Sequence, residues 1–260
     1  MKEISKIRML VHDTNPIVHT ITNYVAANDT ANLLLACNAK PIMSDMTEEI
    51  DEIERISKAL LLNLGTPGFD RVGTMIKAGE TANKYNIPVV FDPVGIAISS
   101  VRRNFAKEIL SRVKVTVIKC NVTELGALSK MYSARGNDTK ESASLLSRAL
   151  NCIVVVTDKK DIITNGAVTY LCNNGNPIMS KVTGTGCMMG ALIAAYIGVQ
   201  KTESLSATLN AVVTFNVAGE VAFERMGSAD GNASYRNYLI DSIHSMTWDE
   251  LEARANYESR

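Results

Sequence analysis

The chain is predicted to form an α/β fold in which an open, mostly parallel central sheet is covered by helices on both faces. Short runs rich in Val, Ile and Leu alternate with longer amphipathic segments along the 260 residues. Hydrophobic residues make up 46% of the chain and aromatic residues only 5%, which suits buried parallel strands. Polar residues recur where the apolar runs end, at the sheet edge that binds ligands in such folds. We expect one domain, 1–260, although the length also permits two smaller ones.

The expected strands are short apolar runs that end near Gly, Asn, Asp or Thr. Residues Pro16 to Ala31 should begin extended and then become helical, and the next apolar run should continue as a core helix. The first of the later strands, 39–45, is expected to be buried. The later strands cover 39–45, 60–66, 87–95, 113–120 and 152–157, and 162–166 should pair with 168–175 as a hairpin at an antiparallel edge.

The expected surface helices carry apolar residues at helical spacing. Acidic residues come early and basic residues late in the clearest of them, which complements the helix dipole. The segment 212–225 is apolar enough for a buried helix, whereas the polar segment 133–142 indicates a surface loop. The tail beyond Gly227 is polar. The surface helices cover 46–59, 69–85, 101–110, 121–128 and 142–150.

Composition limits the class of partner. Lys plus Arg and Asp plus Glu each number 27, so no net field attracts nucleic acid or an acidic membrane surface, and we expect a small-molecule ligand. No apolar run reaches the length of a membrane-spanning helix. An odd number of widely spaced cysteines without a CxxC pair argues against a disulfide framework or a zinc site, and favours the cytoplasm. These cysteines are Cys37, Cys120, Cys152, Cys172 and Cys187.

The stretch from Lys181 to Gly190, KVTGTGCMMG, is the strongest functional candidate. Gly184 and Gly186 precede Cys187 and a run of small apolar residues, so the segment predicts a tight loop that opens a buried helix. The free amides of a helix start bind anions, and glycine lets a phosphate approach the backbone. The same field would favour a thiolate at Cys187, as a base or nucleophile. A plain turn before a buried apolar cysteine is an equally good interpretation of this stretch alone.

Four further candidate residues stand at or just beyond predicted strand ends. Asp92 precedes a proline and glycine turn, where such folds place metal-binding or catalytic carboxylates; capping of the turn is the weaker alternative. Asn121 and Glu124 have the spacing of a capping box but lie at the same edge, so the two interpretations are balanced. For Met43, core packing is favoured. Carboxylates for Mg²⁺, amides for a phosphate and a base at Cys187 together predict phosphoryl transfer.

The chain resembles the hydroxyethylthiazole kinase family of thiamine biosynthesis and salvage, within the ribokinase-like superfamily, from about Pro16 to Arg225. The resemblance implies a transferase that uses ATP and Mg²⁺ to phosphorylate the primary alcohol of 4-methyl-5-(2-hydroxyethyl)thiazole. It also implies a homotrimer with thiazole sites at subunit interfaces. The stretches that carry it are HTITNYVAANDTAN at 19–32, PIMSDMTEE at 41–49, LLLNLGT at 60–66, VVFDPVG at 89–95 and VTGTGCMMGAL at 182–192.

The resemblance also implies roles for individual residues. Met43 and Gly184 look like thiazole-contact residues, and Thr157 looks like an ATP-site residue at the end of its strand. Asp92 and Glu124 would support Mg²⁺ and the phosphates.

Cys187 occupies the place where sugar kinases of the superfamily carry a catalytic aspartate, so it would take or position the proton of the substrate hydroxyl. Two positions depart from the family pattern. Lys119 precedes Cys120 and Asn121 where the family usually has Arg-Gly-Asn, which keeps a phosphate-binding charge and loses a two-pronged contact. Asp158 stands in place of a glycine after Thr157, which predicts weaker or altered nucleotide binding without loss of activity.

Other functions remain to be weighed against this one. A kinase of pyridoxal or of a hydroxymethylpyrimidine belongs to the same superfamily, but Cys187 and the segment HTITNYV favour the thiazole kinase. A catalytically silent scaffold would have lost the base or the metal carboxylates, which are all present here. A Rossmann-type oxidoreductase is disfavoured because the first strand-to-helix turn has no glycine fingerprint.

Overall fold

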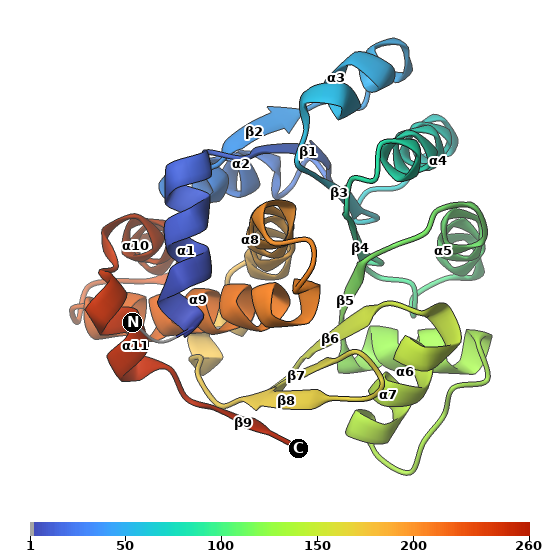
Figure 1. The fold of residues 1–260 in the computed structure, drawn as a ribbon. Helices are drawn as coiled ribbons and strands as arrows, with labels where there is room; N and C mark the ends of the chain where they lie inside the picture. The colour runs from blue at the N-terminus through green and yellow to red at the C-terminus, as the bar shows by residue number, and fades with distance from the viewer. Residues whose placement is uncertain (1–2) are drawn as a thin grey trace.

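One nine-stranded sheet forms the centre of the computed structural model, which describes residues 3–260 (Figure 1). The strand order is β2-β1-β3-β4-β5-β6-β7-β8-β9. Neighbours from β2 to β6 pair in parallel, whereas β7, β8 and β9 pair antiparallel. The strands are β1 Ile17–Ile21, β2 Lys40–Met43, β3 Ala59–Asn63, β4 Val89–Asp92, β5 Val117–Asn121, β6 Ile153–Thr157, β7 Asp161–Thr164, β8 Thr169–Cys172 and β9 Tyr257–Ser259. The predicted mostly parallel sheet and its antiparallel hairpin are confirmed.

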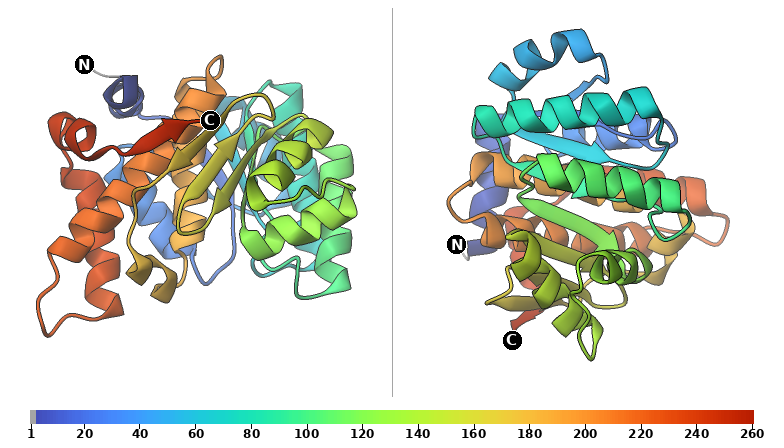
Figure 2. Two further views of the ribbon diagram at one scale, coloured as in Figure 1. Left: turned by 90° about the horizontal axis from the view of Figure 1, so that it is seen from below. Right: turned by 90° about the vertical axis from the view of Figure 1, so that its right-hand side faces the viewer.

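Helices cover both faces of the sheet (Figures 1 and 2). One layer holds α1 Glu3–Thr14, α2 Ala27–Ala36, α8 Thr185–Val199, α9 Ser204–Glu224, α10 Asn232–Ser245 and α11 Trp248–Arg254. The other holds α3 Ile50–Ile56, α4 Phe69–Lys84, α5 Ser100–Arg112, α6 Val122–Met131 and α7 Thr139–Leu150. Short 3₁₀ helices η1 and η2 span Thr47–Glu49 and Pro177–Lys181. The α/β class with helices on both faces is confirmed.

The two hydrophobic cores follow from the two-residue period of the strands. In β4, Val90 packs into the core beneath α8 and α9, while Val89 and Phe91 pack into the core beneath the opposite helices. In β3, all five residues are buried. A strand covered on both faces therefore reads as a continuous apolar run, which is how β3 and β6 were recognised.

Helix starts follow capping chemistry. The Asn121 side chain accepts the N–H of Glu124, and Glu124 accepts the N–H of Asn121, so the predicted capping box begins α6. Asp138 likewise accepts the N–H of Glu141 and begins α7 at Thr139. The predicted surface loop 133–142 therefore extends too far, because residues 139–142 belong to α7. The N-cap Asp138 lies within a polar segment, so the helix start is hard to distinguish from a loop in the sequence.

Two sequence expectations differ from the structure at the margins of the sheet. Strand β2 is an edge strand whose Lys40 and Met43 are exposed, so the expected burial of 39–45 is wrong. An apolar run indicates a strand but not its place in the strand order. The polar tail beyond Gly227 contains α10, α11 and β9, because Tyr235, Leu239 and Ile243 recur at helical spacing among polar residues and are buried. Within residues 3–260, no helix is both long and apolar enough to span a membrane.

Candidate active site

The predicted site residues lie along the carboxyl ends of the parallel strands. Met43 ends β2, Asp92 ends β4 and Thr157 ends β6. The strand order places Met43 and Thr157 five strand steps apart, with Asp92 between them. At about 4.8 Å per strand, this row is about 24 Å long. The structure thus separates the two expected substrate positions along one edge, as the ligand clefts of open α/β sheets require.

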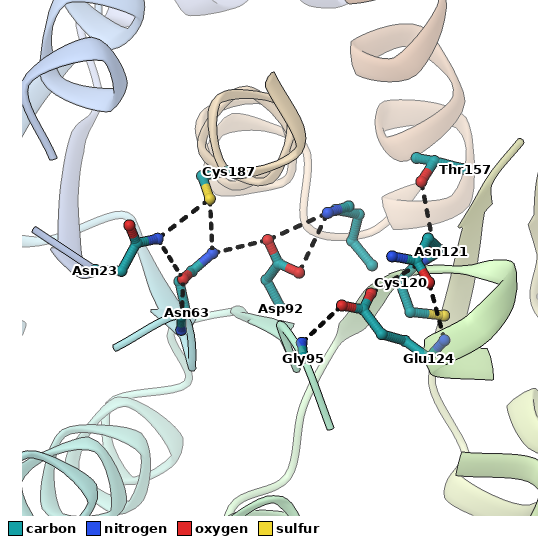
Figure 3. A network of polar contacts seen from close by, with 11 residues as sticks. Asn23, Asn63, Asp92, Gly95, Cys120, Asn121, Glu124, Thr157 and Cys187 are labelled. Carbon is teal, nitrogen blue, oxygen red and sulfur yellow. Dashed lines mark hydrogen bonds and ion pairs between the residues drawn. The ribbon is translucent and has the colours of Figure 1, made fainter. Parts of the chain in front are cut away.

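Cys187 lies at the centre of this row, in the first turn of α8. The side-chain amides of Asn23 and Asn63 each donate to Cys187 Sγ at 3.3 Å (Figure 3). Asn23 also donates to Asn63 Oδ1 at 2.8 Å, and Asn63 donates to Asp92 Oδ2 at 2.8 Å. One polar network therefore joins helix α8 to loop 22–26 after β1 and to the ends of β3 and β4. The sulfur is held as a hydrogen-bond acceptor, which leaves its own proton available to a ligand.

Asp92 forms a buried ion pair with Lys119. Lys119 Nζ lies 3.2 Å from both Asp92 carboxylate oxygens, and the two residues are 5% and 0% exposed. Burial raises the pKa of Asp92 to about 6 although the charge of Lys119 opposes this effect. Burial alone would lower the pKa of Lys119, but the charges of Asp92 and Glu124 outweigh it and raise that pKa. Near pH 7 the pair is therefore charged on both sides.

The ammonium of Lys119 points at the N-terminus of α8. A Cβ built on Gly186 would lie only 2.8 Å from Lys119 Nζ, so glycine is required for this approach. Gly184, the N-cap of α8, has φ of +87°, a left-handed backbone that glycine adopts without strain. The first turn of a 15-residue helix and a buried cation thus face the same space. This combination suits a phosphate group and supports the phosphate interpretation of the GTG loop over a plain turn.

The environment of Cys187 favours a thiol. Burial and the charge of Asp92 raise the pKa of Cys187, and these effects outweigh Lys119 and the two asparagine amides. The expectation that the helix field yields a thiolate is therefore wrong for this arrangement. A helix N-terminus lowers the pKa of a nearby thiol, but loss of solvent and a neighbouring negative charge raise it. At Cys187 the second pair of effects is the larger.

Glu124 is committed to backbone contacts. Its Oε1 accepts the N–H of Gly95 at 2.8 Å and its Oε2 accepts the N–H of Asn121 at 2.9 Å (Figure 3). The carboxylate joins the loop after β4 to the start of α6 and is 5% exposed. The capping interpretation of Glu124 is thus confirmed, and it also places a second carboxylate close enough to act on the pKa of Asp92.

The carboxylates fit a phosphate-bound Mg²⁺ better than a protein cage for the metal. Among residues 3–260, no three His, Cys, Asp or Glu side chains form a group that could hold a metal ion. Mg²⁺ commonly takes one or two carboxylates together with water and substrate phosphates. Each Glu124 oxygen accepts one N–H and keeps a lone pair, and Asp92 Oδ1 accepts from Lys119 alone. The donor set therefore fits this cation in the presence of a nucleotide.

Met43 and Gly184 lie near the same strand. Met43 pairs with Thr20 of β1 and is 38% exposed. A Cβ on Gly184 would meet Ala26 Cβ at 3.2 Å, and Ala26 follows β1 by a short turn. The structure thus brings the two residues to the β1 end of the row, and it places Met43 at the surface instead of in the core.

Thr157 marks the opposite end of the row. Its Oγ1 donates to the carbonyl of Cys120 at 3.4 Å, and Asp158 is exposed in the turn that follows. Asp161 Oδ1 accepts the N–H of Asp158 at 2.9 Å, and Asn216 of α9 donates to Asp161 Oδ2 at 2.7 Å. Burial raises the pKa of Asp161 to about 6. Asp161 therefore fixes the turn that contains Asp158, the residue that stands in place of the glycine expected from the family pattern.

Sequence reasoning missed the three side chains that organise this edge. Asn23 and Asn63 follow or end apolar strands, which is the same signal that selected Asp92. Arg102 donates to the carbonyls of Leu64 and Val94 at 2.9 Å and so ties the loops after β3 and β4 together. Arg102 lies in a helix with ordinary surface composition, and no local pattern distinguishes it.

The fold has counterparts among known structures. A pyridoxal kinase of Staphylococcus aureus solved with AMP-PCP has the same fold, with a TM-score of 0.66, 16% identity and coverage of 94% of this chain and 98% of that one. The strand order and the two helical layers define a ribokinase-like fold. The family model described as "Hydroxyethylthiazole kinase family" matches residues 9–249. The chain belongs to the hydroxyethylthiazole kinase family.

Individual relatives agree over nearly the whole length. A hydroxyethylthiazole kinase of Clostridium acetobutylicum is 42% identical over 96% of this chain and 97% of its own. One of Haemophilus influenzae is 38% identical over 94% and 95%. The solved hydroxyethylthiazole kinase of Pyrococcus horikoshii superposes with a TM-score of 0.94 at 36% identity, covering both chains fully.

Proposed function

We propose that this chain transfers the γ-phosphoryl group of ATP to the primary hydroxyl of 4-methyl-5-(2-hydroxyethyl)thiazole. The observation that supports it most directly is the convergence of Cys187, the Asp92–Lys119 pair and the N-terminus of α8 at the centre of the strand-end row. The family membership of the chain supports the choice of alcohol. We further propose that 1–260 acts as one domain around its single sheet.

The two substrates would approach the centre from opposite ends of the row. Thiazole would lie at Met43 and Gly184, and the nucleotide at Thr157, with its phosphates directed to the α8 amides and Lys119. Phosphoryl transfer requires positioning and charge stabilisation more than covalent chemistry by the protein. The fixed amides and the buried ammonium supply this without reorganisation.

Cys187 is proposed to position the hydroxyl of the alcohol and, once its own proton has passed to solvent, to receive the hydroxyl proton as the bond to phosphorus forms. Because its pKa is raised, a free thiol is the resting state, and the asparagine amides hold Sγ in place. Asp92 and Glu124 would hold Mg²⁺. When bound, that ion neutralises charge on the phosphate oxygens.

We also propose that the protein is a cytoplasmic homotrimer with thiazole sites between subunits. Five free thiols support a reducing compartment. Edge strand β2 and its surroundings support an interface, because Leu35, Tyr24 and Val25 are 57%, 75% and 57% exposed. Light scattering coupled to size exclusion would show about three times the 28.2 kDa chain mass; a monomer at working concentration would contradict the interface.

The catalytic proposal is tested by a coupled ADP-release assay with ATP and Mg²⁺. Hydroxyethylthiazole, pyridoxal and hydroxymethylpyrimidine are supplied separately and then in competition. Turnover that depends on the thiazole supports the proposal. Turnover with another alcohol alone would keep phosphoryl transfer and overturn the substrate.

A further inference from the structure

A buried histidine and glutamate lie beside the thiazole end of the row and have no part in the transfer chemistry. His19 of β1 and Glu54 of α3 are both 0% exposed, and His19 Nδ1 lies 2.6 Å from Glu54 Oε1. His19 Nε2 lies 3.0 Å from the carbonyl oxygen of Ser44. Strands β1 and β2 and helix α3 adjoin at this end of the sheet (Figure 1).

The contacts of the ring fix where its protons are. A carbonyl oxygen can only accept, so Nε2 must carry the hydrogen that it donates to Ser44. Nδ1 and the Glu54 carboxyl then share one proton, either as an ion pair or as a neutral pair. In both cases Glu54 holds the ring plane so that Nε2–H points at Ser44, as a second group commonly orients a histidine.

The carbonyl of Ser44 lies directly after the last residue of β2. Strand β2 lies at the edge of the sheet and pairs only with β1, so the sheet holds Met43 on one side only, and this pairing ends at Thr20 and Met43. The next residues are held from outside by α4, through Arg71 to Asp45 and Thr74 to Thr47 at 2.7 Å each. His19 supplies the contact from inside the sheet, one residue away from Met43.

We infer that His19 is a positioning residue for the alcohol substrate: through the carbonyl of Ser44 it fixes the backbone that carries Met43, and Glu54 fixes the ring. This inference rests on the proposed thiazole kinase activity. A buried polar pair gives less stability than well-packed apolar side chains of the same size, because both groups lose water. What the pair adds is a directed hydrogen bond at the strand end, where Met43 meets the substrate.

Two substitutions of His19 separate its two contacts. The amide nitrogen of asparagine reaches the place of Nδ1, next to Glu54, whereas that of glutamine reaches the place of Nε2, next to Ser44. We expect His19→Asn to raise KM for hydroxyethylthiazole about 10-fold and His19→Gln only about 2-fold, in line with the loss of one buried hydrogen bond. Turnover and KM for ATP should stay within about 2-fold in both variants.

Substitutions of Glu54 give a second, independent pair. Glu54→Gln can still donate to Nδ1 and should keep KM for the thiazole near the wild-type value, whereas Glu54→Leu frees the ring and should act like His19→Asn. Ser147→Ala is the matched control, since Ser147 is also buried and hydrogen-bonded, to the carbonyl of Cys152 on the opposite helical layer. This control shows how a loss of stability away from the site changes turnover and the two KM values.

Unchanged KM for the thiazole in His19→Asn and Glu54→Leu would overturn the inference. Equal increases in both KM values together with lower turnover, as in a destabilised control, would also overturn it. Amide hydrogen exchange of peptides covering 43–46 measures, without substrate, how firmly the His19–Ser44 hydrogen bond holds this backbone. We expect faster exchange in His19→Asn than in His19→Gln, and equal rates would contradict the inference. Failure of the wild type to use the thiazole would refute the proposed function. The exchange data would still show whether His19 fixes the backbone that follows β2.

Discussion

Asp161 gives a prediction whose magnitude follows from its burial. The carboxylate is 4% exposed, and it accepts from the N–H of Asp158 and the amide of Asn216. Burial raises its pKa from the ordinary 3.8 to about 6. The folded protein therefore binds this proton more tightly than the unfolded chain does. The stability from this group is complete below about pH 4 and is lost as the pH rises through about 6.

The substitution Asp161→Asn removes this titration and keeps the shape. Its amide oxygen can still accept from Asp158, and Asn216 can turn its own oxygen toward the new amide. A shift of about two units corresponds to about 3 kcal/mol over the full range. Between pH 8 and pH 5 the wild type should gain about 1.4 kcal/mol of unfolding free energy from Asp161, and the variant should gain none of this share.

Urea denaturation of both proteins between pH 5 and pH 8 measures this difference. The quantity of interest is the wild-type unfolding free energy minus that of the variant at each pH, which cancels every other titrating group. We expect it to grow by about 1.4 kcal/mol on acidification. A difference that is constant with pH, or that shrinks on acidification, would refute the assignment of a raised pKa to Asp161.

Further predictions concern the centre and the two ends of the row. Cys187→Ala should lower turnover about 100-fold with little change in KM for the thiazole, and Cys187→Asp should retain or exceed wild-type activity; near-normal turnover of the alanine variant in the ADP-release assay would reduce Cys187 to a packing residue. Lys119→Met should lower the unfolding free energy by about 3–5 kcal/mol because Asp92 is left buried without a partner, and a second change, Asp92→Asn, should restore part of it in urea denaturation; a single variant as stable as the wild type would contradict the buried pair. Gly184→Ala should cost about 1–2 kcal/mol of stability, because its backbone is left-handed, and should raise KM for the thiazole; unchanged values of both would argue against the tight loop. Asp158→Gly should lower KM for ATP. If the wild type already has the KM for ATP of a typical family member, and the substitution leaves it unchanged, Asp158 has no effect on nucleotide binding.

Local patterns were sufficient for most of the central fold. Apolar runs identified the buried strands, and Asn121 with Glu124 marked a helix start that the structure confirms. The N-terminal helix was not predicted although Ile4, Ile7 and Val11 have helical spacing and are buried. The charged residues between them obscure this apolar stripe in the sequence.

The strand order limits what sequence can show of the site. Asp92 was selected because it ends a strand, but its pairing with Lys119 depends on β4 and β5 being neighbours. The contact of Cys187 with Asn23 joins residues 164 positions apart. The raised pKa of Cys187 comes from burial and from the charge of Asp92, so it depends on how closely α8 packs on the sheet. The sequence contains the groups, and their mutual distances come from tertiary packing alone.

Every residue of α8 from Cys187 to Gly198 is buried, and the helix packs against the sheet, α1, α2 and α9. A helix enclosed on all sides cannot shift without opening the hydrophobic core, so the helix end that we propose binds the phosphates is a stationary reference point. Adjustment to substrates must occur in solvent-facing segments, such as those that follow Met43 and Thr157. Alteration of the alcohol or nucleotide range is therefore best attempted at these two ends, where the catalytic centre need not be rebuilt.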